Sequence, residues 1–264
     1  MKSVVRIMSI AFASLAVLAS CNKDKVDYVG NDNESKEKIG YLNLSNMTAS
    51  VLEDTENIDS VTRAEGVDID KFDVVITNQA GESVMSFKYG ERPTKPIALD
   101  GGVYTLSMSS SEMAGAEFEA PVYAGETEFI ITRLQTTTIE NLVCKLANIK
   151  VTVEYSADLK DQLDPEHTAM TVELEQSALE YAFAEESAGF FAPVAQENTL
   201  KLTFKCRYVD GDKDIIMTNE IKGVKAAQWR KINVVVQHAA DGTASIGIVC
   251  DTWTYDEEVT FDSS

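Results

Sequence analysis

Acidic residues at alternating positions make the stretch after Val209 the first place to look for metal chemistry. Asp210, Asp212 and Asp214 have the i, i+2, i+4 spacing with which calcium loops present oxygen ligands. Ile215 stands where such a loop requires glycine, and Ile221 where it requires glutamate. The Asp-Gly step that opens the stretch is typical of a hairpin turn. We therefore expect a turn with an acidic rim and no bound metal.

The residue types that carry most enzyme chemistry are scarce or isolated in this chain. Only two histidines occur, His167 and His238, too few for a histidine zinc site, and we expect both on the surface. Ser35 and Lys38 fit a Ser-x-x-Lys nucleophile pattern without its companion motifs. No Gly-x-Ser-x-Gly, phosphate-loop or zinc-protease motif is found. We predict no catalytic residue, no metal and no cofactor, and hence a protein that is not an enzyme.

The start of the chain has the pattern of an export signal. Lys2 and Arg6 flank the beginning of an apolar run that ends at Leu18, and no acidic residue occurs before Cys21. The run is too short for a permanent membrane helix. Leu18-Ala19-Ser20-Cys21 resembles the lipobox of bacterial lipoproteins, in which the cysteine is acylated before the signal is cut. We expect residues 1–20 to be removed and Cys21 to carry palmitate and further acyl chains. The alternatives are an ordinary signal peptide with a chance cysteine, or a buried helix.

Three further cysteines lie in the main body of the chain. Cys144, Cys206 and Cys250 each fall within an apolar, strand-like run, and none belongs to a Cys-x-x-Cys or Cys/His cluster. We expect three small buried side chains. If a disulfide forms in the exported protein, Cys206–Cys250 is the expected pair.

Composition limits the partners that this protein can have. Forty-three acidic against 23 basic residues give a net charge of −20, which repels phosphate backbones and anionic lipid headgroups and argues against binding to nucleic acid. With 44% apolar residues the chain can build a substantial core. Residues 21–38 are polar, charged and without periodicity, so we expect them to be the lipidated cysteine and a disordered tether.

Short runs rich in β-forming residues, separated by turn signals, recur from Ile39 onward. Such spacing without interleaved helices predicts an all-β protein with two β-sandwich domains, residues 39–141 and 142–264. One helical stretch is expected, Ser156–Leu163. The expected strands are Gly40–Leu52, Phe72–Thr77, Ser83–Tyr89, Val103–Met108, Glu128–Leu134, Thr136–Leu142, Ala147–Tyr155, Ala169–Glu175, Leu179–Ala184, Thr199–Val209, Lys213–Glu220, Lys231–His238, Ala244–Cys250 and Thr252–Phe261.

Aromatic residues are candidates either for the core or for ligand contact. We expect Tyr181, Phe183, Trp229 and Trp253 to be core residues. The Phe190-Phe191 pair is the exception, because it lies in a loop-like setting where two adjacent large apolar groups cannot easily both point inward.

Several short segments, in this order, resemble the fimbrillin-like (FimA/Mfa-type) lipoproteins of Bacteroidetes, in a DUF4493-like branch of unknown function. The resemblance covers most of the exported chain and implies two tandem transthyretin-like sandwiches. The segments that carry it are Leu18–Cys21, Val61–Ala64, Gly101–Leu106, Ala120–Gly125 and Cys144–Val151.

The resemblance implies assembly by exchange of strands between subunits. A protease would cut after Arg63, the first strand Gly40–Leu52 would leave, and a terminal strand of another subunit would fill the groove. The candidate donor is Trp253–Phe261, which could equally be the last strand of its own domain. Arg63 could equally be a surface arginine in a linker. Ser60 resembles the O-glycosylation site of exported proteins from the same bacteria.

These observations predict an outer-membrane, cell-surface fimbrial subunit or adhesin-like lipoprotein that serves cell adhesion. Its partners would be other fimbrial subunits, or itself, by strand addition, and the membrane through the lipid anchor only. The alternative is a surface glycan-binding lipoprotein that takes a host or dietary glycan. Such a binder should show two or more exposed, coplanar aromatic side chains on one face.

Overall fold

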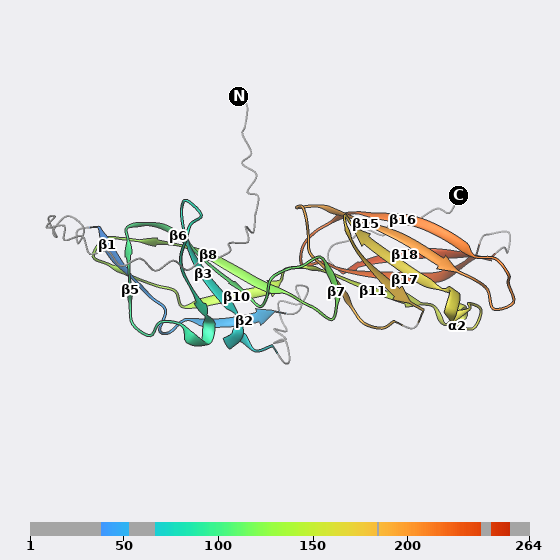
Figure 1. The fold of residues 1–264 in the computed structure, drawn as a ribbon, viewed down its shortest axis with the longest axis horizontal. Coiled ribbons are helices and arrows are strands. Elements are labelled where there is room, and N and C mark those ends of the chain that lie inside the picture. The colour runs from blue at the N-terminus through green and yellow to red at the C-terminus, as the bar shows by residue number, and fades with distance from the viewer. Residues whose placement is uncertain (1–37, 53–66, 184, 239–243, 254–264) are drawn as a thin grey trace, which may run out of the picture.

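The computed structural model describes residues 38–52, 67–183, 185–238 and 244–253. Four sheets account for almost all of the regular structure, and the predicted all-β class with sandwich architecture is confirmed. The sheets form two lobes that lie end to end (Figure 1). No helix in the described ranges has the length and apolar character needed to cross a membrane.

The N-terminal lobe pairs a three-stranded sheet, β5-β1-β9, with a six-stranded sheet, β2-β10-β8-β6-β3-β4. Buried side chains from both sheets form one core. The strands are β1 (Ile39–Asn43), β2 (Thr48–Leu52), β3 (Asp73–Asn78), β4 (Ser83–Lys88), β5 (Ile97–Asp100), β6 (Gly102–Ser109), β8 (Tyr123–Ile131), β9 (Thr136–Thr138) and β10 (Asn141–Leu146), with single 3-10 turns at Ile69–Lys71 and Tyr89–Glu91.

The C-terminal lobe pairs a five-stranded sheet, β18-β17-β11-β14-β7, with a four-stranded sheet, β13-β12-β15-β16. Its strands are β7 (Ala116–Phe118), β11 (Ile149–Tyr155), β12 (Ala169–Leu174), β13 (Ser177–Ala182), β14 (Gly189–Phe191), β15 (Asn198–Cys206), β16 (Ile215–Val224), β17 (Trp229–His238) and β18 (Ala244–Trp253). A one-turn helix, α2 (Ala157–Lys160), and a 3-10 turn at Pro165–His167 follow β11.

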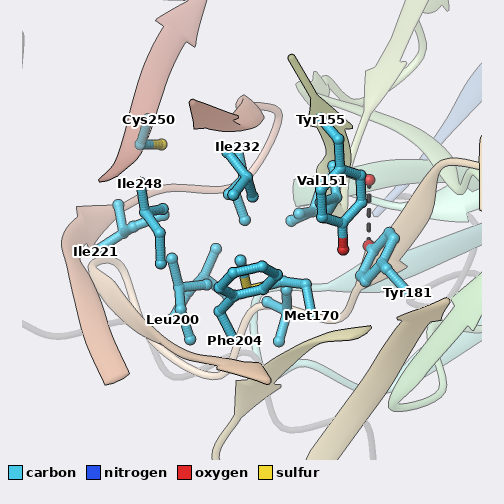
Figure 2. Close-up of a cluster of buried hydrophobic side chains, with 14 of the residues drawn as sticks. Val151, Tyr155, Met170, Tyr181, Leu200, Phe204, Ile221, Ile232, Ile248 and Cys250 are labelled. Atoms are coloured by element: carbon cyan, nitrogen blue, oxygen red, sulfur yellow. Dashed lines mark hydrogen bonds between the residues drawn. The ribbon is translucent and has the colours of Figure 1, made fainter. Parts of the chain in front are cut away.

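Strict alternation along the strands builds the second core. Every second residue of β15, from Asn198 to Cys206, is buried, because successive side chains of a strand point to opposite faces of the sheet. Figure 2 shows Leu200 and Phe204 of β15 facing Val151 and Ile232 of the opposite sheet. The hydroxyl of Tyr181 donates a hydrogen bond to the carbonyl of Val151 at 3.2 Å, so one polar contact also joins the two sheets.

The connection between β6 and β8 ties the lobes together. It leaves the N-terminal lobe, adds β7 to the edge of the five-stranded sheet by pairing with β14, and returns. Beside it, the buried Asn148 side chain donates to the carbonyl of Ala120 at 3.0 Å and accepts from the amide of Val122 at 3.3 Å. The junction is therefore a hydrogen-bonded structure, and not a simple linker.

The structure moves the predicted boundary between the lobes. Residues 142–146 were expected to open the second domain, but they belong to β10 in the six-stranded sheet of the first lobe. Leu142 and Cys144 point into the N-terminal core, whereas Ile149 begins the C-terminal core. The boundary therefore lies between Leu146 and Ile149. The sequence does not reveal this boundary, because β10 and β11 follow each other in one apolar run with the same two-residue period.

Other differences concern short elements. The expected strand Gly40–Leu52 is interrupted by a turn and becomes β1 and β2, whereas the last two expected strands are joined in β18 as far as Trp253. β8 begins at Tyr123, five residues before its expected start, and the expected helix is reduced to α2. β5, β7 and β14 have three or four residues each, too short for a periodic signal.

Candidate functional site

The first described segment of the chain, residues 38–52, spans both sheets of the N-terminal lobe, and we call it the leading segment. β1 is the middle strand of the three-stranded sheet, antiparallel to β5 and parallel to β9. β2 forms the edge of the six-stranded sheet and runs parallel to β10. The leading segment therefore joins β5 to β9 in the three-stranded sheet, and it pairs with β10 as the edge strand of the six-stranded sheet.

Four side chains of the leading segment are buried in the N-terminal core. Leu42 and Leu44 are 0% exposed, Met47 is 1% exposed and Val51 is 3% exposed. Leu44 and Met47 lie at the ends of the turn that joins the strands, where the amide of Met47 donates to the carbonyl of Leu44 at 3.1 Å. This turn lets one short segment present apolar side chains to the core from both sheets.

Backbone hydrogen bonds hold the leading segment to the chain that follows β8. The amide of Tyr41 donates to the carbonyl of Gln135 at 2.8 Å, and the amide of Leu134 donates to the carbonyl of Ile39 at 2.9 Å. Further along, the amide of Thr48 donates to the carbonyl of Glu140 at 2.9 Å. These contacts give β1 and β2 the hydrogen bonds that a strand requires in a sheet.

Gly40 allows β1 to approach the end of β8 closely. A Cβ atom at this position would lie 2.3 Å from the carbonyl oxygen of Thr132 and 2.8 Å from Cγ2 of Ile131. Both distances are shorter than van der Waals contact, so a larger residue would push the strand outward. The glycine is required here by close packing.

The buried tyrosine Tyr89 anchors the turn of the leading segment from the other side. Its hydroxyl donates a hydrogen bond to the carbonyl of Met47 at 2.8 Å. Because this carbonyl is in the apolar interior, loss of the bond would leave a polar group unsatisfied. Any strand that replaced the leading segment would have to place a carbonyl at the position of the Met47 carbonyl to accept this hydrogen bond.

The chain continues from β2 into residues 53–66, which precede the first 3-10 turn and β3. A cut within residues 53–66 would break the only covalent link between the leading segment and the rest of the lobe. Burial of four apolar side chains, at about 1.5–3 kcal/mol each, stabilises the intact arrangement by about 6–12 kcal/mol. The entropy cost of ordering the backbone and side chains of the segment opposes this gain, so the net free energy that retains a cut segment is much smaller.

Most of the predicted processing and modification sites lie outside the described residues. These are the lipidation site Cys21, the protease site Arg63 and the glycosylation site Ser60. The candidate donor strand is described only at Trp253, which ends β18 opposite Trp229. Residues 254–264, which hold the rest of that candidate, are likewise outside the described part.

The three cysteines of the body are buried thiols in the structure. Cys206 lies on β15 and Cys250 on β18, in different sheets, and both belong to the apolar core of the C-terminal lobe. Burial raises the pKa of Cys206 to about 11, with Asp214 acting in the same direction. Cys144 is 0% exposed, and burial raises its pKa to about 11. Burial thus keeps the thiols of Cys144 and Cys206 protonated and unreactive in the folded protein.

The acidic stretch after Val209 is organised by cations of the chain itself. Asp214 is bridged by Arg207 at 2.6 Å and by Lys205 at 3.0 Å, and their hydrogen bonds lower the pKa of its carboxyl group. Within the described ranges no group of three or more metal-binding side chains converges. His167 has a local partner that the sequence did not suggest, Asp164, whose carboxylate lies 2.8 Å from Nδ1.

The aromatic residues mostly serve the core. Tyr181 is fully buried, and Phe190 and Phe191 are 7% and 0% exposed, so the expectation that this pair could not both be buried was wrong. The reason is that they form β14, which lies between β11 and β7 and has cover on both faces. The aromatic side chains that are clearly exposed among the described residues are Tyr41 and Tyr208, one in each lobe. They do not form the coplanar pair expected of a glycan binder.

Trp229 is partly buried at the start of β17 and has two polar contacts. Its indole N–H donates to Oγ1 of Thr152 at 2.9 Å, and the ammonium of Lys150 lies 4.3 Å from the ring centre. One face of the ring is therefore occupied by a cation of the same sheet, which reduces its use as a stacking platform.

A family model described as "Domain of unknown function (DUF4493)" matches residues 38–263 of the chain. No curated protein sequence matches. Among solved structures, the chain is similar to a fimbrial assembly protein from Parabacteroides distasonis, with 10% identity, a TM-score of 0.45, and coverage of 84% of this chain and 98% of that one. It is also similar to the fimbrial anchor protein Mfa2 from Porphyromonas gingivalis, with 10% identity, a TM-score of 0.40, and coverage of 78% and 98%.

Proposed function

The chain belongs to the DUF4493 family, as its sequence predicted, and we propose that it is a cell-surface fimbrial subunit or adhesin-like protein that assembles by exchange of its leading segment. Cutting after Arg63 would separate residues 38–52 from the lobe that they complete. A terminal strand of another subunit would then occupy the groove. The function is structural, with no catalytic step, and the partners are other subunits or further copies of this chain.

The observation that carries this proposal is the position of the leading segment. It supplies the middle strand of one sheet, the edge strand of the other and four buried side chains, yet it lies at the very start of the described body. Loss of this segment would uncover the edge of β10 and separate β5 from β9. An open edge with apolar pockets is the surface that strand addition uses.

Membrane attachment is the second part of the proposal. The lipobox-like sequence that ends at Cys21 supports an acylated precursor in the outer membrane. Because Cys21 precedes Arg63, the proposed cut would also separate the body from its anchor. An uncut chain would remain on the membrane, and a cut chain could enter a fibre.

Limited trypsin digestion of the mature protein tests the proposal. We expect cuts at the lysines of the tether and one further cut after Arg63 that leaves a stable core from Ala64, and multimers by size-exclusion chromatography once the leading segment is released. The matched control is Arg63→Gln, which should abolish this cut and the multimers together. Resistance at Arg63, or a cut core that remains monomeric after release of the segment, would contradict the fimbrial assignment. Mass spectrometry of the N-terminal peptide tests acylation of Cys21 separately.

A further inference from the structure

Three exposed apolar side chains gather at the end of the N-terminal lobe that is farthest from the C-terminal lobe. Leu134 is 70% exposed, Ile130 is 60% exposed and Tyr41 is 41% exposed. We call these three residues the apolar tip. Figure 1 shows β1 at this far end of the molecule. Large apolar side chains that are exposed together mark a contact surface more often than they occur by chance.

Backbone contacts place the three residues in one small region. The amides of Leu134 and Tyr41 bond to the carbonyls of Ile39 and Gln135, so the turn after β8 lies along the start of β1. Thr137, on the other side of β1, donates from its hydroxyl to the carbonyl of Ile130 at 2.7 Å. The three residues of the apolar tip therefore lie on β1, at the end of β8 and in the turn that follows it, which are neighbours in the fold.

Leu134 has an unusual backbone conformation for its residue type. Its φ is 57°, in the left-handed region that glycine and asparagine adopt most readily. The turn uses this conformation, because the amide of Leu134 donates to the carbonyl of Ile39 at 2.9 Å, and Glu119, Glu175 and Ala227 share a positive φ. The exposure of the leucine side chain, and not its backbone conformation, is what indicates a partner outside the molecule.

The path of the chain identifies that partner. The described chain begins at Lys38, whose carbonyl accepts from the amide of Gly101 at 2.8 Å at this same end of the lobe. Cys21, the proposed acylation site, is only seventeen residues before Lys38. Tyr41 is therefore close along the chain to the proposed anchor, and the turn that holds Leu134 lies beside it in the fold.

The chemistry of the tip suits the boundary of a bilayer. Leucine and isoleucine side chains partition into the acyl region, and tyrosine favours the level of the headgroups. Lys38 is exposed at this end of the lobe, and long basic side chains extend toward lipid phosphates. The exposed acidic residues Asp100 and Glu128 lie close by, so the contact we infer is with the apolar side chains and zwitterionic lipid.

We propose that the apolar tip inserts into the lipid surface and holds the uncut protein upright, with the C-terminal lobe directed away from the membrane. The orientation rests on the proposed anchor at Cys21, whereas the affinity of the tip for lipid does not. Because Tyr41 lies on β1, strand exchange would remove part of the tip together with the anchor. The lipid contact therefore belongs to the precursor and is lost on assembly.

Depth-dependent quenching tests this proposal on the mature lipidated protein in phosphatidylcholine vesicles. Leu134→Cys carries an environment-sensitive fluorophore, and Val194→Cys, at a residue that is 61% exposed in the C-terminal lobe, is the matched control. We expect bromine on the lipid acyl chains to quench the label at residue 134 strongly and the label at residue 194 hardly at all. Equal quenching at the two positions would overturn the proposal.

A second measurement separates the tip from the anchor and from self-association. The mature chain with Cys21→Ser lacks acyl chains, and we expect it to bind the same vesicles weakly, about tenfold less when Ile130→Ser and Leu134→Ser are added. Equal binding with and without these substitutions would refute the lipid contact even if Cys21 is acylated. A change in label emission at residue 134 with protein concentration, in the absence of vesicles, would show that a second copy covers the tip and would also overturn the proposal.

Discussion

Cys144 of β10 lies directly opposite Val51 of β2, and both side chains point into the N-terminal core. Cys144 is 0% exposed and Val51 is 3% exposed. The thiol is thus covered on one side by the leading segment, which we propose is replaced during assembly. Departure of β2 would uncover Cys144, and the chain therefore contains its own reporter of strand exchange.

Replacing Gly40 should loosen the leading segment without affecting the rest of the fold. In Gly40→Ala the new methyl group would overlap the carbonyl of Thr132, and we expect a loss of about 1–3 kcal/mol in the free energy of unfolding. Gly102→Ala is the matched control, since its Cβ would meet its first neighbour at 3.8 Å. Urea unfolding measures both. An equal effect of the two substitutions would show that close packing of β1 is not the reason for glycine at position 40.

Truncating Leu44 should show how much the buried side chains of the leading segment contribute. Leu44→Ala leaves a cavity in the core and should lower the free energy of unfolding by about 2–5 kcal/mol. Val143→Ala, on the partner strand β10 and 36% exposed, should cost much less. After a cut at Arg63, the Leu44 variant should also release its leading segment faster than wild type. Release at the wild-type rate would mean that these side chains do not retain the segment.

Asn148 should couple the unfolding of the two lobes. Asn148→Ala leaves the carbonyl of Ala120 and the amide of Val122 without their partner, at a cost of about 1–3 kcal/mol for each group that stays buried. We expect calorimetry to show one transition for wild type and two for the variant. Asn141→Ala, at an exposed position, is the control. Two transitions in wild type would mean that the lobes are already independent.

Stability should fall in alkali because of the buried thiols. Burial raises the pKa of Cys144 and Cys206 from 9.0 to about 11. Between these values the unfolded chain ionises while the folded chain does not, so the folded state loses stability as pH rises through this range. Below about pH 9 the full contribution is present. Urea midpoints from pH 8 to pH 11 should fall less steeply for the Cys144→Ala, Cys206→Ala protein, and identical slopes would contradict the assignment.

Regular alternation made the long strands predictable, whereas short elements were set by tertiary contacts. β15 alternates over nine residues, and its sequence is sufficient to place it. β14 has three residues, too few for a periodic signal, and it becomes an internal strand because β7 arrives from the other lobe to pair with it. Nothing in the local sequence indicates that arrival.

The sequence predicted that a first strand exists, but not how the leading segment is divided between the two sheets. The first strand was expected from the run that begins at Gly40. The family resemblance then predicted that this strand would leave the lobe during assembly. The turn between Leu44 and Met47 moves the chain from one sheet to the other. It holds the turn residues Ser45 and Asn46, and the Asn43 side chain accepts from the amide of Ser45 at 3.0 Å, but the expected strand ran through them as one element. Likewise, the pairing of Val51 with Cys144 joins residues far apart in sequence, and no local pattern encodes it.

Uptake of a replacement strand would show that the leading segment can be exchanged. The protein is cut after Arg63 and incubated with a labelled peptide of residues 38–52, and native mass spectrometry and thiol labelling of Cys144 are followed together. We predict that the cut protein exchanges its own segment for one peptide, that Cys144 is labelled only while the groove is empty, and that uncut protein takes up none. A peptide with Leu44→Asp should fail to bind. Equal uptake by cut and uncut protein, or no uptake by either, would contradict the account.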